Sequence, residues 1–250
     1  MSHHIVEIKD VKYSYPNTSV KALDGVSFRI THGESVGIVG ANGAGKSTLL
    51  MHLIGFLFPA EGTVRVGDYP VTSKTLPQVR RSIGMIFQEP DDQLFMPTVF
   101  EDVAFGPLNM GLPPEEVEER VIKALETVGV LHLKDRPPYK LSGGEKRMVA
   151  IATVLSMTPN ILIMDEPSSA LDPLARRRLI NMLAGFRHTK IIVSHDLDLV
   201  LDLCERTIVL SKGKIIADGL TKDIFLDQEI LVQGHLEKPL RMQSCPVCGK

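Results

Sequence analysis

The 250-residue sequence has no tryptophan and only three cysteines, of which Cys245 and Cys248 lie at the C-terminal end. Disulfides therefore cannot hold most of the chain together, which is typical of a protein in a reducing compartment. The longest apolar runs, such as 161–164, are far shorter than the roughly 18 residues that a membrane helix needs. The N-terminus has no basic segment followed by an apolar core, so we expect no secretory signal.

The sequence also has little net charge, because 28 Lys and Arg residues oppose 30 Asp and Glu residues and leave a formal charge of −2. The strongly basic surface of a duplex-binding protein is missing, and we expect no nucleic-acid partner. Hydrophobic residues make up 44% of the chain and charged residues 23%, as in ordinary globular proteins. This composition excludes disordered, collagenous and coiled-coil classes.

Short apolar runs predict an α/β protein. They predict a β region at 5–11 and buried parallel strands at 36–40, 83–87, 161–164, 191–193 and 208–210. Between 91 and 158 the pattern becomes helical. We therefore expect an α/β core from 1–90 and 159–220, an inserted helical lobe from 91–158, and an extension from 221–250 that begins with a short helix and continues as a loosely ordered tail.

A phosphate-binding loop is predicted between a strand and a helix. Residues 40–47 read Gly-Ala-Asn-Gly-Ala-Gly-Lys-Ser, and Thr48 follows. Glycines let backbone N–H groups face a phosphate, and the positive end of the helix dipole adds to the attraction. Lys46 is expected to neutralise the β- and γ-phosphates, and Ser47 is expected to bind Mg²⁺.

Two adjacent acids follow the apolar run 161–164. The carboxyl end of a parallel strand is where such sheets place their chemistry. As neighbours on a strand, Asp165 and Glu166 are expected to point to opposite faces and to have different roles. Asp165 suits the Mg²⁺ site, and Glu166 suits the orientation or deprotonation of an attacking water.

Residues 141–145 read Leu-Ser-Gly-Gly-Glu, and Ser142 with Glu145 forms the pattern of a helix capping box. Two glycines in the first turn of a helix each cost about 1 kcal/mol relative to alanine. A phosphate that approaches the bare backbone of the helix N-terminus would explain them. We expect the cap and a ligand site to coexist here.

In this order, the three motifs closely resemble those of the nucleotide-binding subunit of an ABC transporter, over about residues 5–220. The resemblance implies a P-loop NTPase fold of the ABC type, with an N-terminal antiparallel β region and an inserted helical lobe. It implies ATP hydrolysis with Mg²⁺ and a head-to-tail pair of two copies. In such a pair, each ATP lies between the phosphate loop of one copy and the signature segment, residues 141–145, of the other.

The resemblance also assigns roles to individual residues. The nucleotide-binding residues it implies are Tyr15, Gly40, Asn42, Gly43, Gly45, Lys46, Ser47, Thr48, Ser142 and Gly144. The catalytic residues it implies are Glu166, His195 and Gln88, and the Mg²⁺ ligands are Ser47, Gln88 and Asp165. Tyr15 would stack on adenine, His195 would sense the γ-phosphate, and residues 169–172 would cross the seam of the dimer. Glu145 and Met148 depart from the family's usual glutamine and arginine.

The segment 88–107 resembles the ATPase subunits of energy-coupling-factor importers, and residues 141–155 favour the cobalt and nickel branch. The partners so implied are a transmembrane coupling protein and a substrate-binding membrane protein, which places the chain peripherally on the cytoplasmic face of the inner membrane. Residues 91–95 are expected to meet the coupling helices, with Leu94 and Phe95 as anchors. Vitamin import stays open, as do a soluble non-transport ABC ATPase and a P-loop switch that does not hydrolyse ATP.

Cys245 and Cys248 resemble half of a zinc site, which needs four ligands. A free dithiol and a site shared by two copies both stay open. Cys204 is expected to be a buried, small apolar residue.

Overall fold

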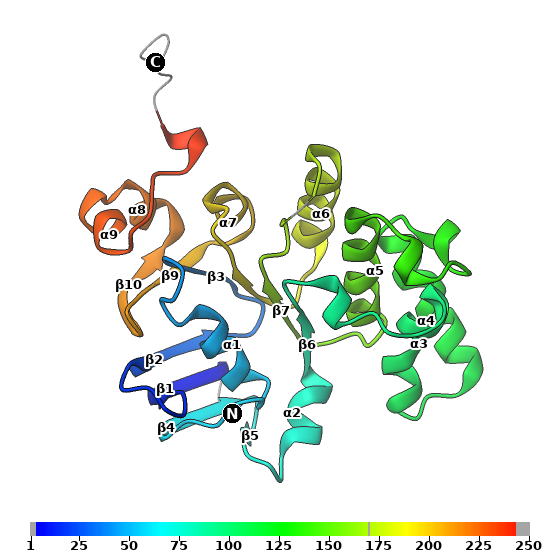
Figure 1. Cartoon of the computed structure of the whole chain (residues 1–250), viewed down its shortest axis with the longest axis horizontal. Helices are drawn as coiled ribbons and strands as arrows, with labels where there is room; N and C mark the ends of the chain where they lie inside the picture. Colours follow the sequence, from blue (N-terminus) through cyan, green and yellow to red (C-terminus); the bar gives the residue numbers. More distant parts are fainter. Residues whose placement is uncertain (1–3, 170, 244–250) are drawn as a thin grey trace. The chain divides into compact units, whose positions relative to one another are not determined.

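A computed structural model describes residues 4–169 and 171–243, and the chain forms two compact units (Figure 1). The first unit comprises residues 1–79 and 190–250, and the second comprises residues 80–189. Ala170, Cys245 and Cys248 lie outside the described residues. No helix within the described ranges is both long and apolar enough to span a membrane.

The described residues of the first unit form two sheets. The antiparallel sheet has the order β2-β1-β4-β5, with bounds β1 (His4–Ser14), β2 (Lys21–Thr31), β4 (Glu61–Val66) and β5 (Tyr69–Pro70). The other sheet has the order β10-β9-β3-β8, with bounds β3 (Ser35–Val39), β8 (Thr189–Val193), β9 (Arg206–Ser211) and β10 (Lys214–Leu220). Strand β3 runs parallel to β8 and β9, whereas β10 runs antiparallel to β9.

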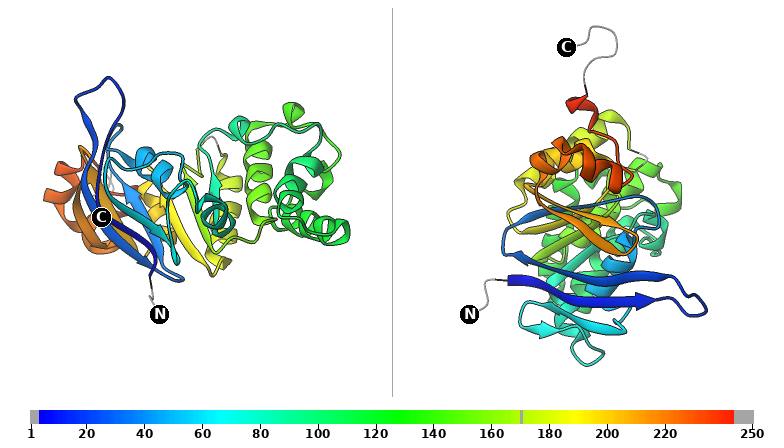
Figure 2. Two further views of the ribbon diagram at one scale, coloured as in Figure 1. Left: turned by 90° about the horizontal axis from the view of Figure 1, so that it is seen from below. Right: turned by 90° about the vertical axis from the view of Figure 1, so that its left-hand side faces the viewer.

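The burial of the strands follows from their sequences. Residues 25–31 of β2 alternate between exposed and buried, as expected for a sheet with one solvated face. Strands β1 and β2 form the long hairpin seen in Figure 2. Strand β8 is buried along its whole length and β3 along all but its first residue, as in a sheet covered on both faces. Among the described residues of this unit, the α-helices are α1 (Lys46–Leu53), α7 (Leu197–Leu203), α8 (Thr221–Leu226) and α9 (Gln228–Gln233), and a 3₁₀ turn occurs at Leu240–Met242.

The second unit combines a parallel strand pair with a group of helices. Strands β6 (Ile83–Ile86) and β7 (Ile161–Asp165) pair in parallel, and α2 (Leu76–Ser82) leads into β6. Helices α3 (Val99–Asn109), α4 (Pro114–Thr127) and α5 (Gly143–Leu155) pack against one another (Figure 1), and α6 (Pro173–Gly185) follows β7. Short 3₁₀ turns occur at Pro90–Asp92, Leu131–Leu133 and Pro138–Lys140.

The predicted strands and the main helices are confirmed at their expected places, but the extension differs from expectation. Two helices, α8 and α9, replace the single short helix. The segment 234–243 is fixed rather than loose, because the Leu240 N–H donates to the Asp198 carboxylate at 3.0 Å and Arg241 forms ion pairs with Asp198 and Asp202. Because these contacts join residues that are far apart in the sequence, local sequence patterns could not predict them.

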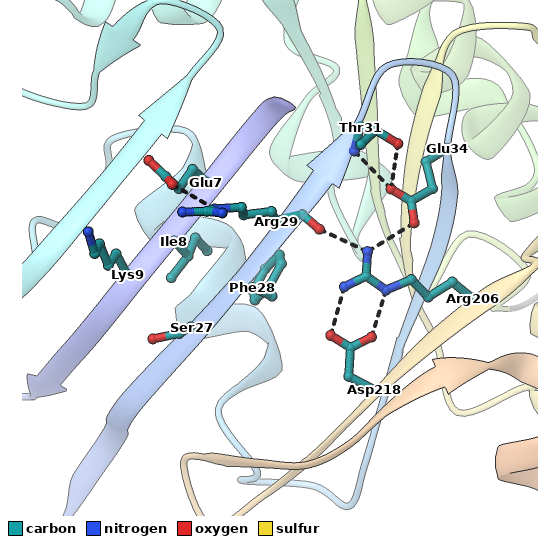
Figure 3. A pocket seen from close by; sticks show the side chains of 10 residues that line it. All are labelled: Glu7, Ile8, Lys9, Ser27, Phe28, Arg29, Thr31, Glu34, Arg206 and Asp218. Carbon is teal, nitrogen blue, oxygen red and sulfur yellow. Dashed lines mark hydrogen bonds and ion pairs between the residues drawn. The ribbon is translucent and has the colours of Figure 1, made fainter. Parts of the chain in front are cut away.

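Arg206 connects three segments of the first unit (Figure 3). Its guanidinium binds both carboxylate oxygens of Asp218 at 2.6 and 2.7 Å, the Glu34 carboxylate at 2.9 Å and the Arg29 carbonyl oxygen at 2.8 Å. Burial opposes the charge on Glu34, but hydrogen bonds from Thr31 and Arg206 outweigh it, so the pKa of Glu34 lies below its usual value. The hydrogen bonds to Asp218 likewise raise the pKa of Arg206. One cation therefore links β9, β10 and the end of β2.

We expect Arg206→Ala to lower the free energy of unfolding by about 1–3 kcal/mol, because it leaves two partly buried carboxylates without their cation. Arg29→Ala is the matched control, since its ion pair with Glu7 is more exposed, and we expect a loss of less than about 1 kcal/mol. Urea denaturation at pH 7 measures both variants. Equal losses in the two would contradict the role given to Arg206.

Candidate functional site

The loop between β3 and α1 has the backbone geometry of a phosphate cradle. Gly40, Gly43 and Gly45 have φ values of +148°, +77° and +106°, a region that residues with a Cβ rarely adopt. A Cβ on Gly40 would lie 2.1 Å from the Leu210 carbonyl oxygen, and one on Gly45 would lie 2.5 Å from that of Ala22. The glycines at both ends of the loop are therefore required by close backbone contacts as well as by conformation.

The loop ends at a helix N-terminus that suits an anion. Gly45 caps α1 without a side-chain hydrogen bond, and the first turn contains no acidic residue. The Lys46 ammonium is buried and donates to the carbonyl oxygens of Gly40 at 2.8 Å and Ala41 at 3.1 Å. Asn42, Gly43 and Ser47 are exposed. A buried cation beneath outward-facing backbone at a helix N-terminus can bind phosphate groups.

Tyr15 lies next to this loop. Its hydroxyl is 3.1 Å from the Thr48 hydroxyl, and its ring, 43% exposed, contacts the Tyr13 ring edge-on. Tyr13 in turn contacts the ring of buried His52, whose Nδ1 lies 2.8 Å from the Thr48 carbonyl oxygen. Burial lowers the pKa of His52, although its backbone hydrogen bonds oppose this. The antiparallel sheet thus brings an exposed aromatic face to the phosphate loop.

His195 is the remaining predicted residue of the first unit. It is exposed between β8 and α7, and the next residue, Asp196, caps α7 through the Leu199 N–H at 2.9 Å. His195, residues 40–42 and the fixed segment 235–240 line one cavity of about 450 Å³. The structure therefore brings His195 to the phosphate loop and adds a C-terminal wall that the sequence did not predict.

In the second unit, the two acids end β7. Asp165 is the last residue of the strand, whereas Glu166 follows it with φ +48°. Glu166 therefore lies outside the strand, in the left-handed region, so the strand alternation on which the opposite-face expectation rests does not apply to it. Both side chains are buried, at 6% and 7% exposure. Non-glycine residues in this conformation are uncommon and concentrate at functional sites.

The signature segment has the predicted capping box. The Ser142 hydroxyl accepts from the Glu145 N–H at 3.3 Å, and the Glu145 carboxylate accepts from the Ser142 N–H at 2.8 Å. The hydrogen bonds that the Ser142 N–H and the Ser142 hydroxyl donate to the Glu145 carboxylate lower the pKa of Glu145. A Cβ on Gly143 would meet nothing within 4 Å, and one on Gly144 only Leu171 at 3.9 Å. The packing of the described residues therefore does not explain why these positions are glycine.

Gln88, Asp91 and Phe95 are exposed on the segment after β6, but Leu94 is only 8% exposed. Leu94 is therefore a core residue, and its expected role as a surface anchor is wrong. Phe95, 63% exposed, packs edge-on against Phe105 on α3 at 5.0 Å between ring centroids. The Asp91 carboxylate is 2.6 Å from the Lys146 ammonium of α5, so it has a partner within this unit.

Two residues near the site escaped the sequence analysis, which singled out Met148 in α5. The neighbouring Arg147 is 3% exposed and donates to the carbonyl oxygens of Phe87 and Gln88. Gln93 donates to the Ala150 carbonyl oxygen at 2.8 Å. The sequence signal that could have revealed Arg147 is an arginine among the apolar residues of α5, which are buried.

Cys204 is buried as expected, and burial raises the pKa of its thiol to about 12.

Comparisons with known proteins show a family and a fold for the chain. The protein-family model described as ABC transporter matches residues 23–169. A protein of Geobacter sulfurreducens, named as an ABC transporter ATP-binding protein, is 66% identical over 250 residues, the full length of both chains. An energy-coupling factor transporter ATP-binding protein of Methanocaldococcus jannaschii is 44% identical over 94% of this chain and 86% of its own length.

Among solved structures, cbiO1 from Clostridium perfringens, described as part of the ABC transporter complex cbiONQ, is similar in fold and sequence. It superposes with a TM-score of 0.82 and 38% identity, over 92% of this chain and 94% of that one. The fold class is therefore that of the ATP-binding cassettes, as the sequence predicted.

Proposed function

Since the chain belongs to the ABC transporter family, and is thus the ATP-hydrolysing subunit of a transporter, we propose that it powers an energy-coupling-factor importer of a transition metal ion, with cobalt favoured. The observation that carries the transporter class is the exposed aromatic pair of Phe95, on the segment between β6 and α3, and Phe105, on α3. The energy-coupling factor name of the Methanocaldococcus jannaschii relative agrees with it. Cobalt rests on the resemblance of residues 141–155 to that branch.

In this proposal, residues 40–48 hold the phosphates of ATP. Backbone N–H groups of the glycine loop and the N-terminus of α1 bind the oxygens, and Lys46 neutralises the β- and γ-phosphates. The exposed ring of Tyr15 stacks on adenine. The edge-on contact with Tyr13 keeps the Tyr15 ring near the loop. The proposed nucleotide-binding residues of the first unit are Tyr15, Gly40, Asn42, Gly43, Gly45, Lys46, Ser47 and Thr48.

Hydrolysis is proposed to depend on Glu166, which orients the attacking water and accepts its proton. His195 and Gln88 contact the γ-phosphate region. The left-handed backbone of Glu166 supports its role, because non-glycine residues in this uncommon conformation concentrate at functional sites. The Ser47 hydroxyl, the Gln88 side-chain oxygen and the Asp165 carboxylate are hard oxygen donors that fit Mg²⁺, which would neutralise phosphate charge when bound.

Substitution of Glu166 and Lys46 separates hydrolysis from binding. Glu166→Gln keeps the side-chain shape but removes the base, so we expect kcat to fall by about 10²–10⁴-fold while ATP binding is retained. Lys46→Ala removes the phosphate cation and should abolish measurable ATP binding. Phosphate release and binding of a fluorescent ATP analogue measure the two effects. Parental turnover by Glu166→Gln would refute the assignment of the base.

ABC ATPases act as dimers with transmembrane partners. For this chain we propose a symmetric, head-to-tail pair, in which Ser142 and Gly144 contact the γ-phosphate held by the other copy's phosphate loop. The open space above Gly143 and Gly144 supports this, since no described neighbour in the chain demands a glycine at either position. The capping box fixes the helix N-terminus from below and leaves its outer backbone for a ligand.

The surface for the transmembrane coupling protein is proposed around Phe95 and Phe105. The Asp102 carboxylate accepts from the backbone N–H groups of Phe95 and Met96, both at 3.0 Å, so the backbone that presents the Phe95 ring is fixed. Fixed, exposed aromatic side chains are typical anchors of protein interfaces. The chain is then peripheral, on the cytoplasmic face of the inner membrane, with a separate substrate-binding membrane protein in the complex.

Replacing both rings, as Phe95→Ala with Phe105→Ala, should leave basal ATPase within about 2-fold and weaken assembly with the membrane subunits by at least about 10-fold. Cobalt uptake by cells that carry the variant should be lost. Val232→Ala is the matched control, because Val232 is also 63% exposed but lies on α9 of the other unit. Normal assembly and uptake by the double variant would exclude this surface.

Vitamin import is the second candidate cargo class. The Methanocaldococcus jannaschii relative carries the energy-coupling factor name without a metal. The ATPase, dimer and docking proposals are the same for either cargo, since the cargo binds the membrane partner in this class.

A further inference from the structure

A buried arginine on α5 has no role in the function proposed above. Arg147 is 3% exposed, and its Nη1 donates to the Phe87 carbonyl oxygen at 2.7 Å. Its Nη2 donates to the carbonyl oxygen of Gln88, and its Nε is buried without a hydrogen-bond partner in the part of the chain that the structure describes. Burying a guanidinium with backbone carbonyls as its acceptors carries a large desolvation cost.

The electrostatic surroundings offset part of that cost. Burial lowers the pKa of Arg147, and the charges of Glu89, Asp165 and Glu166 oppose this effect. Because an arginine remains protonated even after a sizeable decrease in pKa, the side chain is a cation at neutral pH. It therefore lies within the electric field of the carboxylate pair and touches the backbone of Gln88 at the same time.

A second tether holds the same segment to α5. The Gln93 side chain donates to the Ala150 carbonyl oxygen at 2.8 Å and to the Thr153 hydroxyl at 2.6 Å, and its Oε1 accepts from the Phe87 N–H at 3.4 Å. Residues 87–93 are thus fixed to α5 near both ends. A neutral amide is sufficient for such a tether, so packing alone does not require a charge at position 147.

We propose that Arg147 is a positioning residue for ATP hydrolysis, which holds Gln88 in register with α5 through the backbone carbonyls of Phe87 and Gln88. This rests on the proposed function, in which Gln88 serves the γ-phosphate region and α5 begins at Ser142. Arg147 lies about 7.5 Å along the helix axis from Ser142, at a rise of 1.5 Å per residue. A movement of the signature segment is then transmitted to Gln88 over little more than one helical turn.

The test measures kcat and ATP affinity separately, in the purified full chain. Arg147→Met keeps the apolar stem and removes both donors, so Gln88 loses its register. We expect kcat to fall about 10–100-fold, as small misplacements of reacting groups do. The Kd for ATP should stay within about 2-fold, because the phosphate loop belongs to the other unit. Arg147→Lys keeps one cationic donor and should recover part of the lost kcat.

Lys146→Met is the matched control, since it removes the neighbouring cation and its partly exposed ion pair with Asp91, and its kcat should stay parental. Urea denaturation corrects each rate for the folded fraction. Parental kcat in folded Arg147→Met overturns the inference. If Arg147→Met does not fold, Arg147→Lys decides: a decrease in kcat of at least about 3-fold at unchanged Kd supports it, and parental kcat overturns it.

Glu166→Gln, assayed in parallel, keeps the two proposals distinct. If Glu166→Gln hydrolyses ATP at the parental rate, the proposed catalytic assignment fails. If Glu166→Gln is inactive while folded Arg147→Met is parental, only the positioning role of Arg147 fails.

Discussion

The closeness of three backbone segments around the phosphate loop is the constraint on which the first unit depends. The loop touches β9 at Gly40 and β2 at Gly45, where any Cβ would collide with a carbonyl oxygen. The turn between β9 and β10 completes the enclosure, because the Gly213 N–H donates to the Ala44 carbonyl oxygen at 3.0 Å and its carbonyl accepts from Asp24 at 2.8 Å. The loop therefore has its shape before any ligand arrives, and a preorganised set of donors needs little rearrangement to bind charge.

In each unit, a buried cationic side chain donates hydrogen bonds to backbone carbonyl oxygens and so holds a loop in place. Lys46 binds the carbonyls of Gly40 and Ala41, and Arg147 binds those of Phe87 and Gln88. In each case a long side chain reaches from a helix to a loop that contains proposed functional residues. A single side chain therefore connects each helix to its loop. We interpret the desolvation cost of burying each cation as the cost of a fixed geometry at the reacting groups.

The sequence predicts features that depend on local chemistry. The spacing of the glycines in 40–45 predicts the phosphate loop. Ser142 and Glu145 predict the cap of α5, and apolar runs such as 161–164 predict buried strands. Features that depend on distant residues could not be predicted. Leu94 is buried by neighbours that the local pattern does not reveal. Arg147 meets Gln88 across 59 positions, and Arg241 meets Asp198 across 43. The turn of Glu166 out of β7 could not be predicted either, because the alternation of side chains between two faces assumes an unbroken strand.

The central claim is that each ATP site is shared between two copies of the chain, and mixing two inactive variants tests it most directly. Ser142→Arg blocks the signature segment, and Lys46→Ala disables the phosphate loop, so neither variant alone should hydrolyse ATP. In an equimolar mixture, half of the dimers are mixed and each has one intact site. With two-fold pairing, the account predicts recovery of about one quarter of parental activity. A mixture that exchanges subunits, as verified by mass tags, but stays as inactive as its components would contradict shared sites.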